Sequence, residues 1–177
     1  MKSRIFWLIT TLLTSVCSVQ ADEVWDSGHY IMDGEVYFEI SMYNDATADI
    51  LSGEAYKLEM FNNTSADIFG GTIDVVLIWD NSNINIMGGQ FQRLGSYDNS
   101  EIFLHAYDVT YHPTGGGNHG DMPWIEGIYI SDDSHFSCDL WGQDVYSHIN
   151  VVPEPSGLLL FFIGGIFAKR RLNKNFC

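Results

Sequence analysis

A period of 18 residues runs through the middle of the chain and orders both its apolar and its small polar positions. Aliphatic residues recur in two columns, at Ile40, Leu58, Val76 and Leu94 and at Ile50, Ile68, Ile86 and Leu104. An aromatic column contains Tyr43, Phe61, Trp79 and Tyr97, and a glycine column contains Gly53, Gly71 and Gly89. Because chemically distinct columns agree without a gap, the pattern predicts a repeat architecture.

The segments between the glycine positions and the Asp-Asn-Ser positions are rich in Ile, Val, Phe, Tyr and Trp, which favours short β-strands bounded by turns. A repeat of 18 residues is too short for a helical hairpin or a propeller blade. One coil per repeat therefore predicts an all-β fold, a parallel β-solenoid (β-helix), in which equivalent residues stack at about 4.8 Å.

Two corners of the coil follow from the same columns. Glycine recurs where the backbone must turn with positive φ, which costs other residues energy. Asparagine tolerates the left-handed region, so we expect the second corner at Asp45, Asn63, Asn81 and Asn99. We also expect the aromatic column to stack ring on ring, and Glu39 to lie beside Lys57 of the next coil.

The ends of a solenoid expose strand edges that need covering. Residues 22–30 are expected to cover one end, and the non-repetitive residues 112–150 are expected to form a β-rich cap at the other. Within that cap we predict strands at 125–130 and 134–140 and a Gly-rich loop at 113–123. The predicted organisation is a signal peptide (1–21), solenoid repeats (22–111), a C-terminal cap (112–150) and a sorting tag (151–177).

The first 21 residues have the layout of a secretory signal peptide. Lys2 and Arg4 precede the apolar run 5–13, and small residues lead to a cleavage point after Ala21. The apolar run is too short for a membrane span and a cleavage site follows it, so we predict a signal helix that signal peptidase removes.

The chain ends on an apolar segment followed by basic residues. The run 157–168 has 12 residues, about 18 Å of helix at ~1.5 Å per residue, whereas a bilayer core needs roughly 20 apolar residues. Lys169, Arg170 and Arg171 follow it as a basic stop. One interpretation is a weak single-pass anchor oriented by these charges; the other, which we favour, is a short hydrophobic helix that inserts transiently and is presented to a protease.

The motif Pro153-Glu154-Pro155, the apolar run and the basic stop together resemble the PEP-CTERM sorting signal. The repeat 85–100, with Gly88-Gly89 and Tyr97-Asp98-Asn99-Ser100, resembles repeats found in many PEP-CTERM proteins. The resemblance implies export in a Gram-negative bacterium, an inner-membrane intermediate processed by exosortase, and a final location at the cell surface or in the extracellular matrix. It implies no activity.

Charge narrows the classes of partner. The whole chain has a formal charge of −15, and in residues 22–152 the 22 acidic residues face only Lys57 and Arg93, which gives −20. Such a surface repels nucleic acid and anionic lipid, so we predict no nucleic-acid partner and consider extracellular polysaccharide instead. Cys138 is the one cysteine of this region and is expected to be a small buried apolar residue.

Candidate ligand sites are weak. His112 precedes the Gly-rich loop, and His119 and Asp121 lie within it. Their spacing fits no strict metal-ligand pattern, and a surface loop is the favoured interpretation. Asp49 and Asp67 occupy one column in adjacent coils; they could form a carboxylate pair for acid–base chemistry or bind Ca²⁺, but a solvated polar ladder follows from repetition alone. We therefore predict no cofactor, with Ca²⁺ as the one ion considered.

No catalytic motif is present in the sequence. Neither a Ser-His-Asp order nor G-x-S-x-G occurs, and a polysaccharide lyase would have only Lys57 and Arg93 as bases on a strongly acidic surface. We predict no enzyme, but a structural or adhesive protein of exopolysaccharide or biofilm. The alternative is a carbohydrate-binding module or weak glycan-active enzyme on a β-helix, which would require exposed aromatic or carboxylate groups that converge in a groove.

Overall fold

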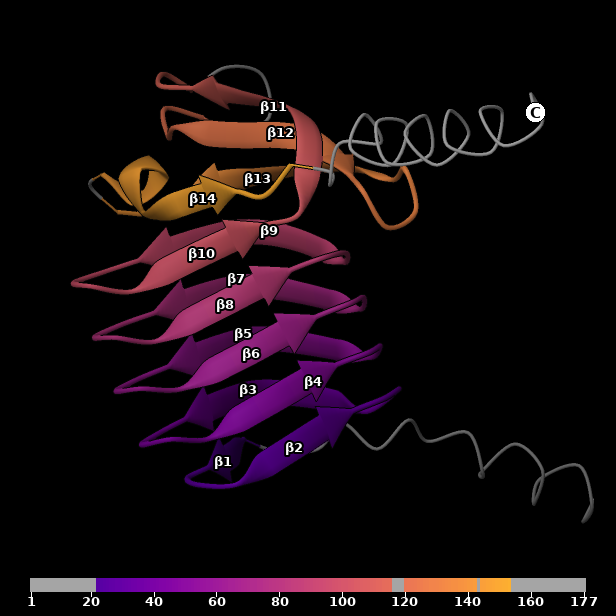
Figure 1. Cartoon of the computed structure of the whole chain (residues 1–177), viewed down its shortest axis with the longest axis vertical. Helices are drawn as coiled ribbons and strands as arrows, with labels where there is room; N and C mark the ends of the chain where they lie inside the picture. Colours follow the sequence, from indigo (N-terminus) through magenta and orange to yellow (C-terminus); the bar gives the residue numbers. More distant parts are fainter. Residues whose placement is uncertain (1–21, 116–119, 143, 154–177) are drawn as a thin grey trace, which may run out of the picture.

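The computed structural model describes residues 22–115, 120–142 and 144–153. There the chain winds into stacked coils, and each coil contributes one strand to each of two facing sheets (Figure 1). The larger sheet has eight strands in the order β1-β3-β5-β7-β9-β13-β12-β11. The smaller sheet has six, in the order β14-β10-β8-β6-β4-β2.

The strands of the larger sheet are longer than those of the smaller sheet in the repeated coils. The larger sheet contains β1 (Glu23–Trp25), β3 (Val36–Met42), β5 (Glu54–Met60), β7 (Thr72–Ile78), β9 (Gln90–Ser96), β11 (Ala106–His112), β12 (Trp124–Tyr129) and β13 (His135–Leu140). The smaller sheet contains β2 (His29–Met32), β4 (Thr47–Ile50), β6 (Ser65–Ile68), β8 (Asn83–Ile86), β10 (Glu101–Leu104) and β14 (Ile149–Val151), with the 3-10 helix η2 (Val145–His148) before β14.

Neighbouring coils pair in the register that the repeat predicts. Leu58 of β5 pairs with Val76 of β7, a separation of one period, and the strands are parallel. The predicted parallel β-solenoid is thus confirmed. The first coil departs from the period, because Trp25 of β1 pairs with Met42 of β3 and the two are one residue closer in sequence than the repeat requires.

The hydrophobic core lies between the two sheets. Every residue of the two aliphatic columns is at most 2% exposed, and full burial of such a side chain contributes about 1.5–3 kcal/mol. Trp25 closes the N-terminal end of this core. It is 3% exposed, its ring stacks on Tyr30 with centroids 4.9 Å apart, and the ring of Tyr37 meets it edge-on at 6.3 Å.

One corner of each coil is formed by the glycine column. Gly53, Gly71 and Gly89 have φ values of 107°, 91° and 101°, as predicted. Space is also restricted there, since a Cβ on Gly71 would lie 2.9 Å from the carbonyl oxygen of Gly53. Glycine is therefore required both for the backbone conformation and for the close approach of successive coils.

The second corner lies one residue earlier than predicted. The left-handed residues are Asn44, Asn62, Asp80 and Asp98, with φ between 57° and 62°, and not the column that begins with Asp45. Asn and Asp both tolerate this conformation, so composition does not distinguish two adjacent polar columns. What fixes the corner is the next column, Ala46, Thr64, Ser82 and Ser100, whose side chains are at most 1% exposed and point into the core.

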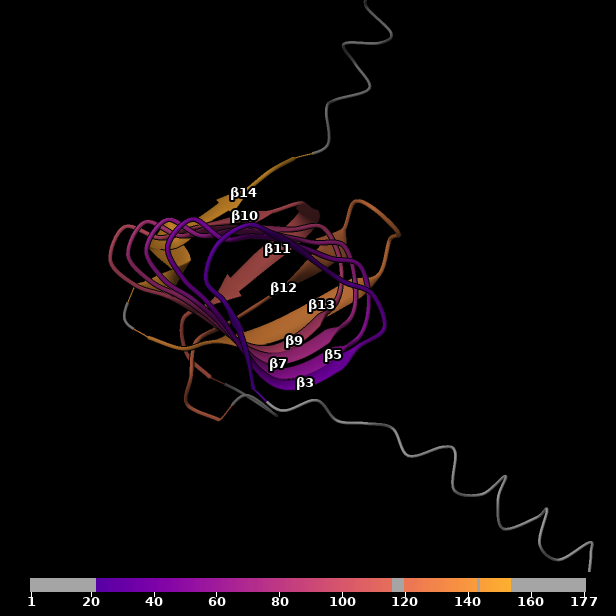
Figure 2. The same ribbon diagram turned by 90° about the horizontal axis from the view of Figure 1, so that it is seen from below.

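The C-terminal cap combines parallel and antiparallel pairing. β13 continues the larger sheet through Leu140, which pairs with Leu94 of β9, and β14 continues the smaller sheet through Ile149, which pairs with Ile102 of β10. The antiparallel hairpin β11–β12 is inserted before them. Seen along the stack, β11 and β12 cross the area that the coils enclose (Figure 2), and Tyr129 of β12 is fully buried in the core.

The predicted strands 125–130 and 134–140 correspond to β12 and β13. β11 belongs by its antiparallel pairing to the cap, although it falls within the segment 22–111 assigned above to the repeats. The expected signal helix and C-terminal helix, together with Ala21, His119, Glu154, Pro155, Lys169, Arg170 and Arg171, lie outside the described residues. Within the described ranges no helix is long and apolar enough to cross a membrane.

Candidate functional site

The aromatic column forms the expected ladder. Ring centroids are 5.0 Å apart for Tyr43 and Phe61, 6.1 Å for Phe61 and Trp79, and 4.0 Å for Trp79 and Tyr97, with interplanar angles of 10° or less. Because each ring covers a face of the next, the ladder offers no flat platform along its length. Its rings stabilise the stack of coils, each pair by about 0.5–1.5 kcal/mol.

The Asp49–Asp67 column exists in the predicted register, but its carboxylates do not converge on one point. Asp67 Oδ1 accepts a hydrogen bond from Asn85 Nδ2 at 2.7 Å, one coil above. Asp49 Oδ2 lies 3.3 Å from His29 Nε2, one coil below. Each carboxylate is therefore bound by a different neighbour, and among the described residues there is no group of three or more His, Cys, Asp or Glu that could hold a metal ion.

His112 is engaged by a residue that the sequence did not single out. Its Nε2 lies 3.0 Å from Glu126 Oε1 on β12, and its ring stacks on Trp124 with centroids 3.7 Å apart. Asp121 is exposed in the turn before β12. The structure thus places His112 with Glu126 rather than in a set with Asp121.

Both basic side chains of the described residues take part in contacts along the larger sheet. Lys57 Nζ lies 3.1 Å from Glu39, as predicted, and 3.3 Å from Glu59. Burial lowers the pKa of Lys57, but the hydrogen bond to Glu39 and the charge of Glu59 outweigh this effect and leave the pKa raised. Arg93 lies over the ring of Trp141 at 5.5 Å.

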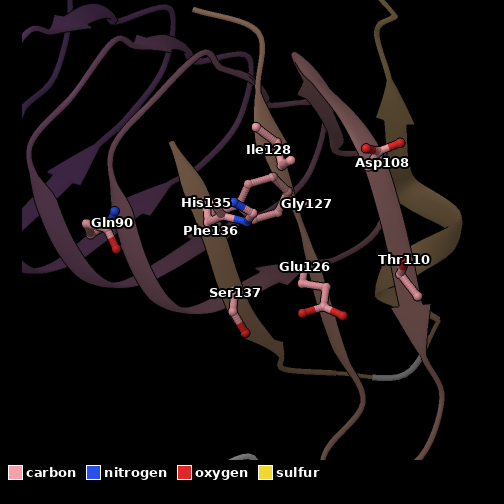
Figure 3. A pocket seen from close by; sticks show the side chains of 9 residues that line it. All are labelled: Gln90, Asp108, Thr110, Glu126, Gly127, Ile128, His135, Phe136 and Ser137. Carbon is pink, nitrogen blue, oxygen red and sulfur yellow. The ribbon is translucent and has the colours of Figure 1, made fainter. Parts of the chain in front are cut away.

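A groove opens on the cap, on the outer face of β11, β12 and β13 (Figure 3). Its volume is about 510 Å³, within the range of roughly 300–1,000 Å³ that is typical of ligand pockets. Its lining carries two carboxylates, an imidazole, an amide and two hydroxyls beside apolar groups: Gln90, Asp108, Thr110, Glu126, Gly127, Ile128, His135, Phe136 and Ser137.

Incomplete pairing of β13 accounts for the hollow. Most neighbouring strands of the larger sheet pair along nearly their whole length, but β13 pairs with β9 only through Asp139–Arg93 and Leu140–Leu94. The beginnings of the two strands therefore separate, and Gln90, the first residue of β9, lies at the edge of the opening.

The polar side chains of the groove are ordered by cross-strand register. Glu126 of β12 pairs with Thr110 of β11 on one side and with Ser137 of β13 on the other, so a hydroxyl, a carboxylate and a hydroxyl form one row. The β11–β12 register shifts just before Thr110, and Asp108 at that bulge has φ 52°. Bulges re-aim side chains beside functional sites, and here the bulge brings a second carboxylate to the groove.

A smaller hollow of about 220 Å³ lies on the larger sheet, lined by Val36, Tyr37, Glu54, Ala55, Tyr56, Thr72 and Asp74. Beside it Phe38 and Tyr56 stack with centroids 5.2 Å apart, and both side chains are about half exposed. This is the one exposed aromatic pair of the repeated coils in the described residues, and it is separate from the ladder.

Cys138 is buried at 4% exposure, as expected for an apolar core residue. Burial raises the pKa of its thiol to about 12, so the nucleophilic thiolate is scarce near neutral pH. Burial likewise raises the pKa of Tyr129. Neither side chain reaches the groove on the opposite face of the cap.

Sequence reasoning missed Asp108, Glu126 and His135. The alternation of polar and apolar residues along 124–129 and 135–140 was visible, and it indicates which side chains share the outer face. That these side chains lie in one groove depends on the antiparallel register of the cap strands and on the bulge of β11. The 18-residue repeat carries no information about either.

Comparisons with protein-family models, with curated proteins and with solved structures found no match for this chain.

Proposed function

We propose that this chain is an exported protein of the cell surface or extracellular matrix, with a structural or adhesive role in exopolysaccharide or biofilm. The N-terminal leader would direct export through signal peptidase, and the Pro153-Glu154-Pro155 motif with its apolar run and basic stop would direct exosortase processing after transient insertion in the inner membrane. No enzymatic activity is part of the proposal.

The observation that carries the proposal is the unbroken stack of coils. Aliphatic columns, the Tyr43–Tyr97 ladder and the glycine corner repeat at each level, and both ends of the core are covered, by Trp25 and by the β11–β12 hairpin. Such a stack is a stiff rod, since each coil is held by its neighbours. Its acidic surface keeps it soluble and extended among polymers.

The mass of the C-terminal peptide of the native protein tests the proposed route. The peptide would be recovered from envelope and culture-medium fractions of the source cell. We expect it to end between Pro153 and Ser156, with or without an added glycan. A peptide that retains Lys169, Arg170 and Arg171 in the membrane fraction would contradict exosortase sorting and would make the protein a tethered one.

The cap groove favours a second candidate, a carbohydrate-binding module on the same scaffold. Carboxylates and hydroxyls line this groove, the kind of surface expected of a glycan-binding β-helix. The two candidates are compatible, because an adhesive rod needs a surface that holds the polymer. A weak glycan-active enzyme would further require turnover, which is tested by release of reducing ends from oligosaccharides.

A further inference from the structure

We propose that the cap groove is the site at which this protein holds a glycan, and that the glycan is an amino-sugar oligosaccharide with free ammonium groups. The biological setting rests on the proposed function above, but the binding itself depends only on the groove. Three features of its lining point to this class: its mixture of polar groups, the sign of its charge, and the placement of its carboxylates on adjacent strands.

The polar lining suits a ligand rich in hydroxyls. Thr110 and Ser137 offer groups that both donate and accept hydrogen bonds, and the amide of Gln90 does the same. Ile128 and Phe136 add apolar surface to the lining. A sugar ring, with hydroxyls around its edge, matches this surface better than a flat apolar molecule does.

The negative charge of the groove favours some classes of sugar over others. Two carboxylates, Asp108 and Glu126, line the groove, and no Lys or Arg is among its lining residues. The wider surface is strongly acidic, since residues 22–152 contain only Lys57 and Arg93 as basic side chains. Uronic-acid or sulfated glycans are therefore repelled, whereas an ammonium group gains charge-assisted hydrogen bonds.

The two carboxylates differ in how they are held. Glu126 has a partner in His112, at 3.0 Å, and its side chain is 46% exposed, so it keeps oxygen surface for a ligand. Asp108 stands at the bulge of β11 with an exposed side chain. Glu126 pairs with Thr110, and Asp108 lies in the bulge of β11 two residues before Thr110, so the two carboxylates stand on adjacent strands of the groove. On the proposal, each would meet an ammonium group of the bound oligosaccharide.

Calorimetry with three matched hexasaccharides tests the proposal. The probes are the β-1,4-linked hexamers of glucosamine, of N-acetylglucosamine and of glucose, which differ only at carbon 2. The protein is expressed from its full coding sequence. At a pH that keeps the amines protonated, we expect the glucosamine hexamer to bind at least about tenfold more tightly than the other two. Raising the pH until the amines lose their protons should abolish the difference.

Two matched variants locate the site. Asp108→Asn removes one groove charge and is expected to weaken binding of the glucosamine hexamer about tenfold. Asp98→Asn removes the same charge from a corner outside the groove, and its left-handed φ of 59° resembles the 52° of Asp108, so the backbone cost is similar. We expect Asp98→Asn to change the affinity less than twofold. Glu126→Gln is a second groove variant, in case Asp108→Asn lowers the melting temperature.

Several outcomes would overturn the proposal: equal affinity for the three hexamers, no binding of any, or equal losses in Asp98→Asn and Asp108→Asn, which would indicate diffuse attraction to the acidic surface. Failure here leaves the sorting route intact if the C-terminal peptide is processed. Conversely, specific binding with an unprocessed C-terminus would keep the glycan site and reject exosortase sorting.

Discussion

The hydroxyl of Ser82 donates a hydrogen bond of 2.6 Å to the carbonyl oxygen of Trp79 and accepts one of 3.1 Å from the amide of the same residue. A buried side chain thus closes the corner turn that carries the aromatic ladder. Ser100 repeats the arrangement with Tyr97, at 2.7 Å and 3.1 Å.

Removal of this hydroxyl should loosen the corner. Ser82→Ala removes these two side-chain bonds, whereas the amide of Trp79 still donates to the carbonyl of Met60 and its carbonyl still accepts from the amide of Ser82. We therefore expect a loss of about 0.5–1.5 kcal/mol in the free energy of unfolding. Urea unfolding followed by tryptophan fluorescence measures it. A loss below about 0.5 kcal/mol, the size of a neutral surface change, would mean that the hydroxyl contributes no net stability at this corner.

Thr64 occupies the same column one coil earlier and behaves differently. Its Oγ1 is buried and makes no hydrogen bond within the described residues. Thr64→Val keeps the shape and removes the unsatisfied hydroxyl, so we expect the protein to become more stable, by about 1 kcal/mol. The same unfolding experiment applies, with Ser82→Ala as its opposite in sign. Destabilisation would show that Thr64 has a partner, such as an internal water.

Gly71 of the glycine corner and Gly28 near the start of the stack allow the cost of backbone strain to be separated from the cost of a steric clash. Gly71 and Gly28 have similar φ, 91° and 100°, but a Cβ on Gly71 would contact backbone at 2.9 Å, whereas one on Gly28 would meet nothing within 4 Å. Both alanine variants pay the backbone strain, of the order of 1–3 kcal/mol. We expect Gly71→Ala to lower the melting temperature clearly more than Gly28→Ala. Equal decreases in melting temperature for the two variants would mean that position 71 requires glycine only because of its positive φ.

The side chain of Trp25 should contribute strongly to the stability of the N-terminal end of the stack. Trp25→Ala exposes the end of the core beneath Met42, and we expect a loss of about 3–5 kcal/mol. Trp141→Ala is the matched control, because that indole is 44% exposed and its truncation should cost far less. Hydrogen exchange would locate the damage, with β1 and β2 losing protection first. Similar losses for both variants would contradict the capping role of Trp25.

The thiol of Cys138 should resist alkylation in the native protein. With its pKa raised to about 12 by burial, it remains protonated where an ordinary thiol, at 9.0, begins to ionise. The folded state holds the proton more tightly, so this group contributes stability that is complete below pH 9 and is lost as the pH rises toward 12. Iodoacetamide labelling, read on the peptide that contains Cys138, should be slow at pH 8.5 and fast after denaturation. Rapid labelling of Cys138 in the folded protein would mean that the cap opens and exposes this thiol to the reagent.

Most of the solenoid could be predicted from the repeat, because several columns of different chemistry share one period and therefore indicate the same coil. The aliphatic columns, the Gly53–Gly71–Gly89 corner and the Glu39–Lys57 pair all follow from the period. The second corner was displaced by one residue, since neighbouring Asn and Asp columns have the same local preference and only inward packing of the Ser82 column decides between them.

The cap groove shows the opposite situation. The polar faces of β12 and β13 were readable from alternation, but the row Thr110–Glu126–Ser137 depends on pairing between segments far apart in the sequence. The bulge that orients Asp108 and the separation of β13 from β9 are outcomes of packing at the end of the stack. The 18-residue repeat does not encode them.

The insertion of the β11–β12 hairpin before β13 has a consequence for how this molecule can vary. Each interior strand of the repeated coils pairs with the equivalent strand of the coil above and of the coil below, and the cap groove is lined by residues of the cap and by Gln90, the first residue of β9. Whole units of 18 residues can therefore be gained or lost between β3 and β9 without changing the register of either end. The length of the stack would then change in steps of about 4.8 Å, while the cap and its groove stay the same.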